Sequence, residues 1–144
     1  MPGRDHKLER RENTARHELT VVMEETTYCR EHHEVTLGHL RRWLHHLNRA
    51  GHLLLSDLEL EIDNSLPESA WLWTAIDGTL SASRQVVEIR HRIIARSDSD
   101  ALSGGLYEEL GIDVQLKGIQ ECVSQIMTLI PRNTDLMPEA YGEG

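Results

Sequence analysis

The chain contains no phenylalanine, and it has only three tryptophans and three tyrosines among its 144 residues. Its core must therefore be mainly aliphatic, and a chain of this size buries enough surface to fold without metal or disulfide. Two cysteines, Cys29 and Cys122, are too few for a disulfide framework. The composition predicts one domain that packing alone holds together.

Long hydrophobic runs are also absent. No apolar run approaches the roughly 18 residues of a membrane-spanning helix, and the first residues lack the apolar stretch of a signal peptide. We therefore expect a cytoplasmic protein without a membrane partner. The sequence also lacks a Gly-rich phosphate loop, a Gly-x-Ser-x-Gly elbow and a His-Glu-x-x-His motif. These absences argue against an enzyme, and we expect no cofactor.

The net charge of −9 is unevenly distributed along the chain. Residues 1–50 carry a balance of +1 and seven of the nine histidines, whereas residues 51–144 carry a balance of −10. A nucleic-acid-binding region attached to an acidic body has this pattern. A protein whose oppositely charged regions attract each other in two copies has the same pattern. The charge distribution leaves both interpretations open.

Apolar residues at a three-four spacing run through the first third of the chain. They are Leu8, Ala15, Leu19, Val22, Cys29, Leu40, Trp43 and Leu47. This spacing continues without interruption, which favours one helix from about residue 6 to residue 50. Polar residues on the same seam, Thr26 and His33, together with Gly38, favour a break between about 26 and 36. Gly51 has the features of a residue that ends a helix.

The segment 52–62 fits two structures. Apolar and acidic residues alternate from Leu58 to Ile62, which is the pattern of a strand and predicts a small β-hairpin with its turn near Ser56. However, Leu54, Leu58 and Ile62 also follow a spacing of four, and leucine and glutamate form helices well. The sequence does not decide between the hairpin and a helix.

Two further helices complete a mainly α fold. The pattern Ser65-Leu-Pro-Glu68 resembles a capping box and predicts a helix over about 67–96. Its apolar surface is wide enough to indicate burial against more than one neighbour. A break at Ser97–Asp100 precedes a single turn at Leu106–Leu110 and a last helix over about 113–130. We expect a single helical domain over 1–131 and a disordered tail over 132–144.

Two groups of residues have the spacing of metal ligands. Cys29 is followed by His32 and His33, but a structural zinc site needs four ligands, and Cys122 offers the only other thiolate. Glu88 and His91 form one Glu-x-x-His motif, whereas di-iron bundles use two. We therefore expect no metal site.

Basic residues gather in two places. One cluster lies before Gly51, and the second cluster comprises Arg84, Arg90, Arg92 and Arg96. Long cationic side chains often lie over apolar surface without a ligand. The functional interpretation is contact with phosphate groups.

Residues 29–62 resemble a winged helix-turn-helix. Val35-Thr36 would form its turn, Thr36 would cap a recognition helix ending at Ala50-Gly51, and the hairpin at 52–62 would be the wing. The resemblance implies a DNA-binding transcriptional regulator, with residues 65–131 forming the helices of a homodimer. The residues it places at the nucleic acid are Thr36, His39, Arg41, Arg42, His45, His46 and Arg49.

Two other functions remain open. The first is a helical self-association or adaptor protein, in which residues 6–50 pack against the two later helices and leave more apolar surface than a monomer buries. The second is a small viral RNA-binding regulator that uses the arginine clusters and stacks bases on Trp71 or Trp73. Strands at 52–62 would favour the winged interpretation over both.

Overall fold

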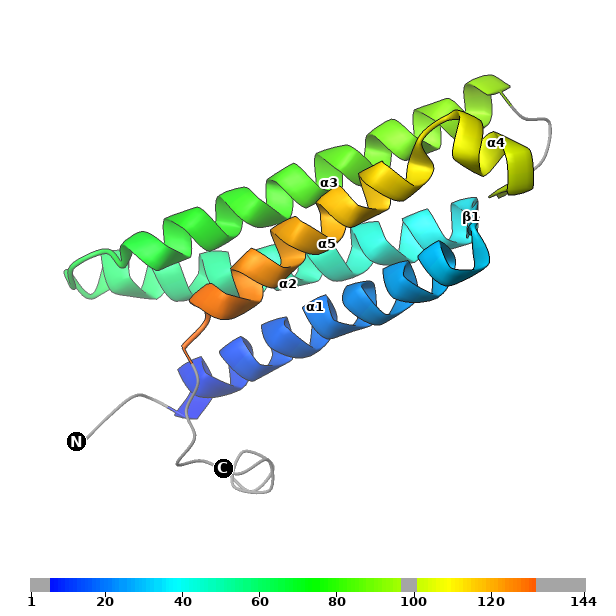
Figure 1. Cartoon of the computed structure of the whole chain (residues 1–144). Coiled ribbons are helices and arrows are strands. Elements are labelled where there is room, and N and C mark those ends of the chain that lie inside the picture. The colour runs from blue at the N-terminus through cyan, green and yellow to red at the C-terminus, as the bar shows by residue number, and fades with distance from the viewer. Residues whose placement is uncertain (1–5, 97–100, 132–144) are drawn as a thin grey trace.

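Four long helices form an antiparallel bundle (Figure 1), in a computed structural model of the chain that describes residues 6–96 and 101–131. They are α1 (His6–His32), α2 (Leu37–Asp63), α3 (Ala70–Arg96) and α5 (Ile112–Leu129). Both α1 and α3 pack against α2 and α5, so that the four helices surround one aliphatic core. The predicted mainly α fold is confirmed.

A small cap closes one end of the bundle. Strand β1 (Glu34–Thr36) pairs antiparallel with β2 (Ala101–Ser103), and the short helix α4 (Gly104–Glu109) follows. The register places Val35 opposite Leu102, and both side chains are fully buried. Figure 1 shows β1 and α4 at this end, whereas α1 begins and α5 ends at the opposite end.

The first apolar seam is divided between two helices. His33 has a positive φ of 50°, which α-helices do not accommodate, and the chain then becomes extended in β1. Thr36 is the N-cap of α2, as expected. The break predicted between about 26 and 36 is therefore present, and the single helix over 6–50 is wrong.

Helix α2 continues through Gly51 to Asp63. The predicted helix end at Gly51 is wrong, and of the two structures that the sequence left open for 52–62 the helix is present and the hairpin is not. Leu54 and Leu58 are buried four residues apart. The segment therefore follows the four-residue spacing of a helix and not the two-residue alternation of a strand. Gly51 serves close packing instead, since a Cβ atom there would lie 2.7 Å from Oγ1 of Thr79 on α3.

The connection between α2 and α3 also differs from the prediction. Ser65 was expected to cap the next helix, but it has a positive φ of 55° and lies just after α2. The carboxylate of Glu61 accepts hydrogen bonds from the backbone nitrogen of Ser69 (2.7 Å) and from its hydroxyl (2.6 Å). This contact holds the connection, and α3 begins at Ala70 rather than at Pro67.

The last helix follows the prediction closely. Its expected apolar stripe from Leu116 to Ile130 is buried in the core, and α4 corresponds to the single turn expected near Leu110. The break predicted at 97–100 and the tail predicted at 132–144 lie outside the described residues.

Candidate interaction surface on helices α2 and α3

Two of the residues predicted to contact nucleic acid instead begin helix α2. The backbone nitrogen of His39 donates to Oγ1 of Thr36 (3.0 Å), and the backbone nitrogen of Thr36 donates to Nδ1 of His39 (3.1 Å). This reciprocal capping satisfies two backbone groups at the helix start. Burial, and then the nearby Arg42, lower the pKa of His39, which favours the neutral form of the ring that can accept this hydrogen bond.

Three more predicted residues bind carboxylates of α1. The guanidinium of Arg42 lies 3.2 Å from Glu25. Glu18 accepts a hydrogen bond from His46 at 2.6 Å and forms an ion pair with Arg49 at 3.3 Å. The side chains that were expected to reach phosphates therefore join α2 to α1.

Glu25 has a second role in this contact. Its Oε1 atom also accepts a hydrogen bond from Nε1 of the buried Trp43 at 2.9 Å. Buried indole N–H groups need such a partner. The carboxylate that pairs with Arg42 is thus also a hydrogen-bond partner of a core residue.

The two remaining predicted residues, Arg41 and His45, are exposed. Arg41 lies in a groove of about 240 Å³ between α2 and α3, where Arg90 lies on the opposite helix. The groove is otherwise lined by apolar residues, which are Leu37, Leu40, Leu44, Val86 and Val87. Sequence reasoning placed Arg41 and Arg90 in separate clusters, and the fold brings them together.

An exposed apolar row continues from this groove along α3. Its members recur every seven residues and keep large exposed fractions: Trp73 54%, Leu80 57%, Val87 37% and Ile94 51%. A separate set of α3 residues, from Leu72 to Ile93, fills the core. The wide apolar surface predicted for this helix is therefore real, but α2 and α5 bury only part of it.

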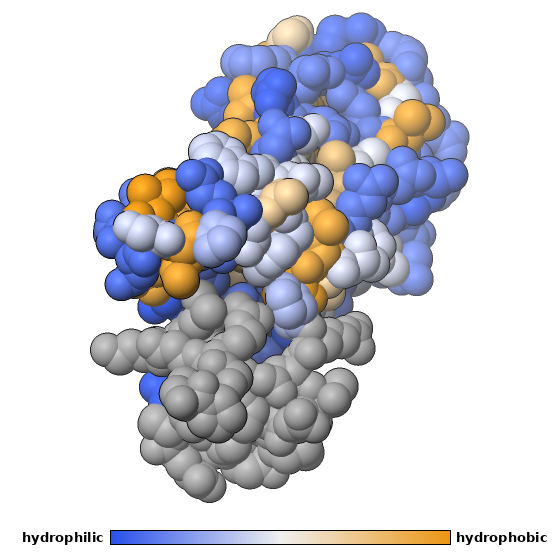
Figure 2. Space-filling view, turned by 90° about the vertical axis from the view of Figure 1, so that its left-hand side faces the viewer, coloured by the Kyte–Doolittle hydropathy of each residue, from blue (hydrophilic) through white to orange (hydrophobic). Residues whose placement is uncertain are grey.

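Helix α2 adds apolar residues beside this row. Leu44, Leu55 and Ile62 are all more than a third exposed. Leu44 meets Val87 in the groove, and Gly51 meets Thr79 further along, which fixes how the two antiparallel helices are aligned. Figure 2 looks onto the end of the bundle where α2 is followed by α3, and it shows hydrophobic residues among polar ones on that end.

The charged residues beside the apolar row are sorted by sign. Arg41, Arg84 and Arg90 lie on the cap side of Leu80, whereas Asp77 and Glu59 lie on the side of the α2–α3 connection. Glu88, which accepts a hydrogen bond from Gln115 of α5, is an acidic exception on the cap side. The other five are all exposed. Among residues 6–96 and 101–131, none of them forms an ion pair with another side chain. We call this surface, with its apolar row and its two charged ends, the α2–α3 face.

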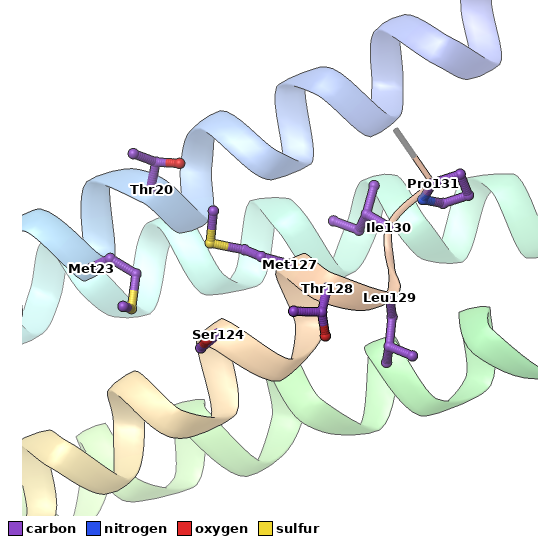
Figure 3. A pocket seen from close by; sticks show the side chains of 8 residues that line it. All are labelled: Thr20, Met23, Ser124, Met127, Thr128, Leu129, Ile130 and Pro131. Atoms are coloured by element: carbon purple, nitrogen blue, oxygen red, sulfur yellow. The ribbon is translucent and has the colours of Figure 1, made fainter. Parts of the chain in front are cut away.

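A second hollow lies between α1 and α5 (Figure 3), with a volume of about 650 Å³. Met23 of α1 and Met127 of α5 line it, and its lining contains no ionisable side chain. At its rim, Arg16 donates to the carbonyl oxygen of Pro131 at 2.8 Å. The hollow therefore offers space, apolar contact and the hydroxyl groups of Thr20, Ser124 and Thr128, with no ionisable side chain in its lining.

The residues with metal-ligand spacing are not gathered into a site. Within the described part of the chain, no three residues of the types His, Cys, Asp and Glu are placed to hold a metal ion. Cys29 is buried, and its burial together with Glu25 and Glu34 raises the pKa of the thiol to about 12. Such a thiol is a poor nucleophile.

A polar cluster joins α1 to the start of α5. Arg30 contacts the carboxylate of Asp113 with two nitrogens, at 3.1 and 3.2 Å, and the hydroxyl of Tyr107 donates to the same carboxylate at 3.1 Å. The hydrogen bond from Arg30 lowers the pKa of Asp113, and burial raises the pKa of Tyr107. The side chains of Arg30, Tyr107 and Asp113 are therefore hydrogen-bonded to one another, which is typical of a structural contact.

No helix among the described residues is long and apolar enough to cross a membrane. The chain matches no family model, no curated protein and no solved structure.

Proposed function

We propose that this protein is a non-enzymatic helical association protein that binds a protein partner through the α2–α3 face. The observation that carries the proposal is the row Trp73, Leu80, Val87 and Ile94, which remains exposed along the whole length of α3. Contiguous exposed apolar surface marks interaction sites in soluble proteins. A row with a seven-residue repeat fits a helical partner, because helices pack against each other at that period.

The pairing of the basic residues supports the same proposal. Arg42, His46 and Arg49 are engaged with Glu25 and Glu18. Binding of phosphates by these three residues would therefore compete with contacts that hold α1 on α2. The segment 52–62, which the winged interpretation needs as two strands, is helical. Binding of a protein through the α2–α3 face requires neither the release of these ion pairs nor strands at 52–62.

The proposal is tested by photo-crosslinking in the cells from which the protein comes. A photoreactive amino acid replaces Leu80 at the centre of the row, and a matched variant carries it at Val114, an isolated exposed residue on α5. We expect one discrete protein adduct at position 80 and none at position 114. Failure of position 80 to form a protein adduct, or equal adducts at both positions, would refute the proposal.

Nucleic-acid binding is the second candidate function. The observation that favours it is the set of exposed arginines without ion-pair partners in the described chain, Arg41, Arg84 and Arg90. It predicts that labelled duplex DNA or RNA binds at low salt, with an affinity that falls steeply as salt is raised. Fluorescence anisotropy measures this. Absence of binding at low salt would exclude the candidate.

A further inference from the structure

We propose that the partner of the α2–α3 face is a second copy of this chain, bound in an antiparallel two-fold dimer. The inference rests on the proposed function, and it adds the identity and orientation of the partner. The two-fold axis crosses the helices at right angles near Leu80, so that α3 lies along α3 of the second copy and α2 along α2. The cap end of each copy then faces the connection end of the other.

Charge complementarity is the first argument for this orientation. The α2–α3 face carries Arg41, Arg84 and Arg90 on its cap side, with Glu88 at the border to α5, and Glu59 and Asp77 on its connection side. Rotation by half a turn about the central axis places each basic end over an acidic end. A parallel arrangement would instead place like charges together, which is unfavourable. The face is therefore complementary to itself in the antiparallel orientation alone.

The register of α3 is the second argument. Asp77 and Arg84 lie three residues before and four residues after Leu80. When two α3 helices cross antiparallel at this point, Arg84 lies within one residue of the position opposite Asp77 of the second copy, which long side chains can span, and the reverse pair forms by symmetry. The same crossing places Val87 opposite Trp73. Within one copy, Asp77 and Arg84 are about 10.5 Å apart along the helix, too far to pair directly.

The residues of α2 place the two-fold axis at the same height in the bundle as those of α3. A crossing near His52 places Glu59 opposite His45 of the second copy, and His52 lies beside Gly51, which contacts Thr79. Position 52 of α2 and position 80 of α3 therefore lie at nearly the same height in the bundle. One axis therefore brings Glu59 opposite His45 on α2 as well as Arg84 near Asp77 on α3.

The size of the face suits a stable dimer. From Leu37 to Ile62, α2 extends over about 37 Å, and two adjacent helices are about 20 Å wide. The face therefore offers about 700 Å² per copy, close to the ~800 Å² per partner of a standard specific interface.

Charge exchange at Asp77 and Arg84 tests the dimer on the purified full chain. The variants are Asp77→Arg, Arg84→Asp and the double variant, and sedimentation velocity over a concentration series measures their association. Both positions are exposed, and circular dichroism melting verifies that the monomer fold is retained. Each single variant places like charges at two symmetric positions, and we expect association to weaken about tenfold or more. The double variant restores the opposite charges and recovers association.

Mixing the two single variants gives the decisive result. The Asp77→Arg copy is then basic at both positions and the Arg84→Asp copy is acidic at both, so the antiparallel pairs are complementary again. We expect a heterodimer to form where each variant alone is monomeric. Leu80→Asn, at the centre of the interface, should weaken association about tenfold or more without changing the charges of the two ends.

Three results would overturn the inference. They are a wild-type chain that stays monomeric at high concentration, single variants that dimerise as the wild type does, and a mixture that does not form heterodimers. A monomeric wild type together with a crosslink from position 80 to a different protein would refute the homodimer and leave the proposed function intact. Binding of nucleic acid that is lost in Arg84→Asp and not restored in the double variant would assign the basic end to nucleic acid instead.

Discussion

The substitution Gly51→Ala tests whether α2 runs unbroken past the residue that looked like its end. In a helix interior, alanine is favoured over glycine by about 1 kcal/mol. At this position, however, the added Cβ would lie 2.7 Å from Oγ1 and 3.4 Å from Cβ of Thr79. The hydroxyl of Thr79 donates to the carbonyl of Ile76 at 2.7 Å, which holds the side chain in place. Overpacking of this kind costs about 1–3 kcal/mol.

The clash exceeds the gain in helix propensity, so we expect Gly51→Ala to lower the free energy of unfolding by about 1 kcal/mol. In a Thr79→Ala background Oγ1 is gone and only Cβ of residue 79 remains, at the ordinary contact distance of 3.4 Å. The same substitution should then raise the free energy of unfolding by about 0.5–1 kcal/mol. The coupling between the two positions is then about 2 kcal/mol, which is large for a contacting pair. Urea unfolding followed by circular dichroism measures all four proteins of the cycle.

Gly38→Ala is the matched control, because its Cβ would meet no atom closer than 3.5 Å. It should stabilise the protein by up to about 1 kcal/mol. If Gly51→Ala lowers the free energy of unfolding by the same amount with and without Thr79→Ala, the contact between residues 51 and 79 is not the cause. That result would mean that residue 51 needs glycine for its backbone conformation, as a helix end does, and not for the approach of α3.

Three further perturbations test other contacts. Arg11→Met removes a guanidinium that lies 2.6 Å from Asp57, whose side chain is 1% exposed. We expect the free energy of unfolding in urea to fall by about 1.5–3 kcal/mol, the range for a hydrogen bond to a charged group, and to fall less in the double variant with Asp57→Leu, which also removes the buried carboxylate. The pKa of Asp113 is lowered by Arg30, so its contribution to stability is present above about pH 4 and is lost as the pH falls through the folded-state pKa. Arg30→Met should therefore flatten the acid side of the stability profile, and an unchanged profile would contradict the assignment. Burial lowers the pKa of His39, so stability is lost as the pH falls from about 6.5 through its folded-state pKa, and His39→Ala should lose less stability than the wild type over this window.

The fold class could be predicted because the long helices carry clear periodicity. The last helix has buried residues from Leu116 to Ile126 at regular spacing, and its bounds were predicted within one residue at each end. The N-cap Thr36 was also recognised, since threonine at that position has a simple chemical reason. Local patterns of this kind need no knowledge of the rest of the fold.

The error at Gly51 has a physical cause. Glycine at the end of a helix and glycine at a close contact between helices look the same in a sequence. Only the position of Thr79 on α3 distinguishes them. The alternation from Leu58 to Ile62 reinforced the error, because one side of α2 is left unburied there and keeps exposed apolar residues.

The candidate site could be predicted only in part. The sequence identified the basic residues of α2, but not their partners, because Glu18 and Glu25 lie on a different helix and pair with them only in the folded bundle. The exposed row on α3 did leave a signal, namely an apolar surface too wide for one neighbour. The sequence could not show which part of that surface stays uncovered, since this depends on where α2 and α5 pack.

Both the architecture and the proposed function depend on α2 being one helix from Leu37 to Asp63. Backbone Cα chemical shifts across this segment test that claim most directly. We expect helical deviations without interruption, through Gly51 and up to Ile62. Strand-like deviations over residues 52–62, with a break at Gly51, would contradict the structure, remove the α2–α3 face and restore the winged interpretation.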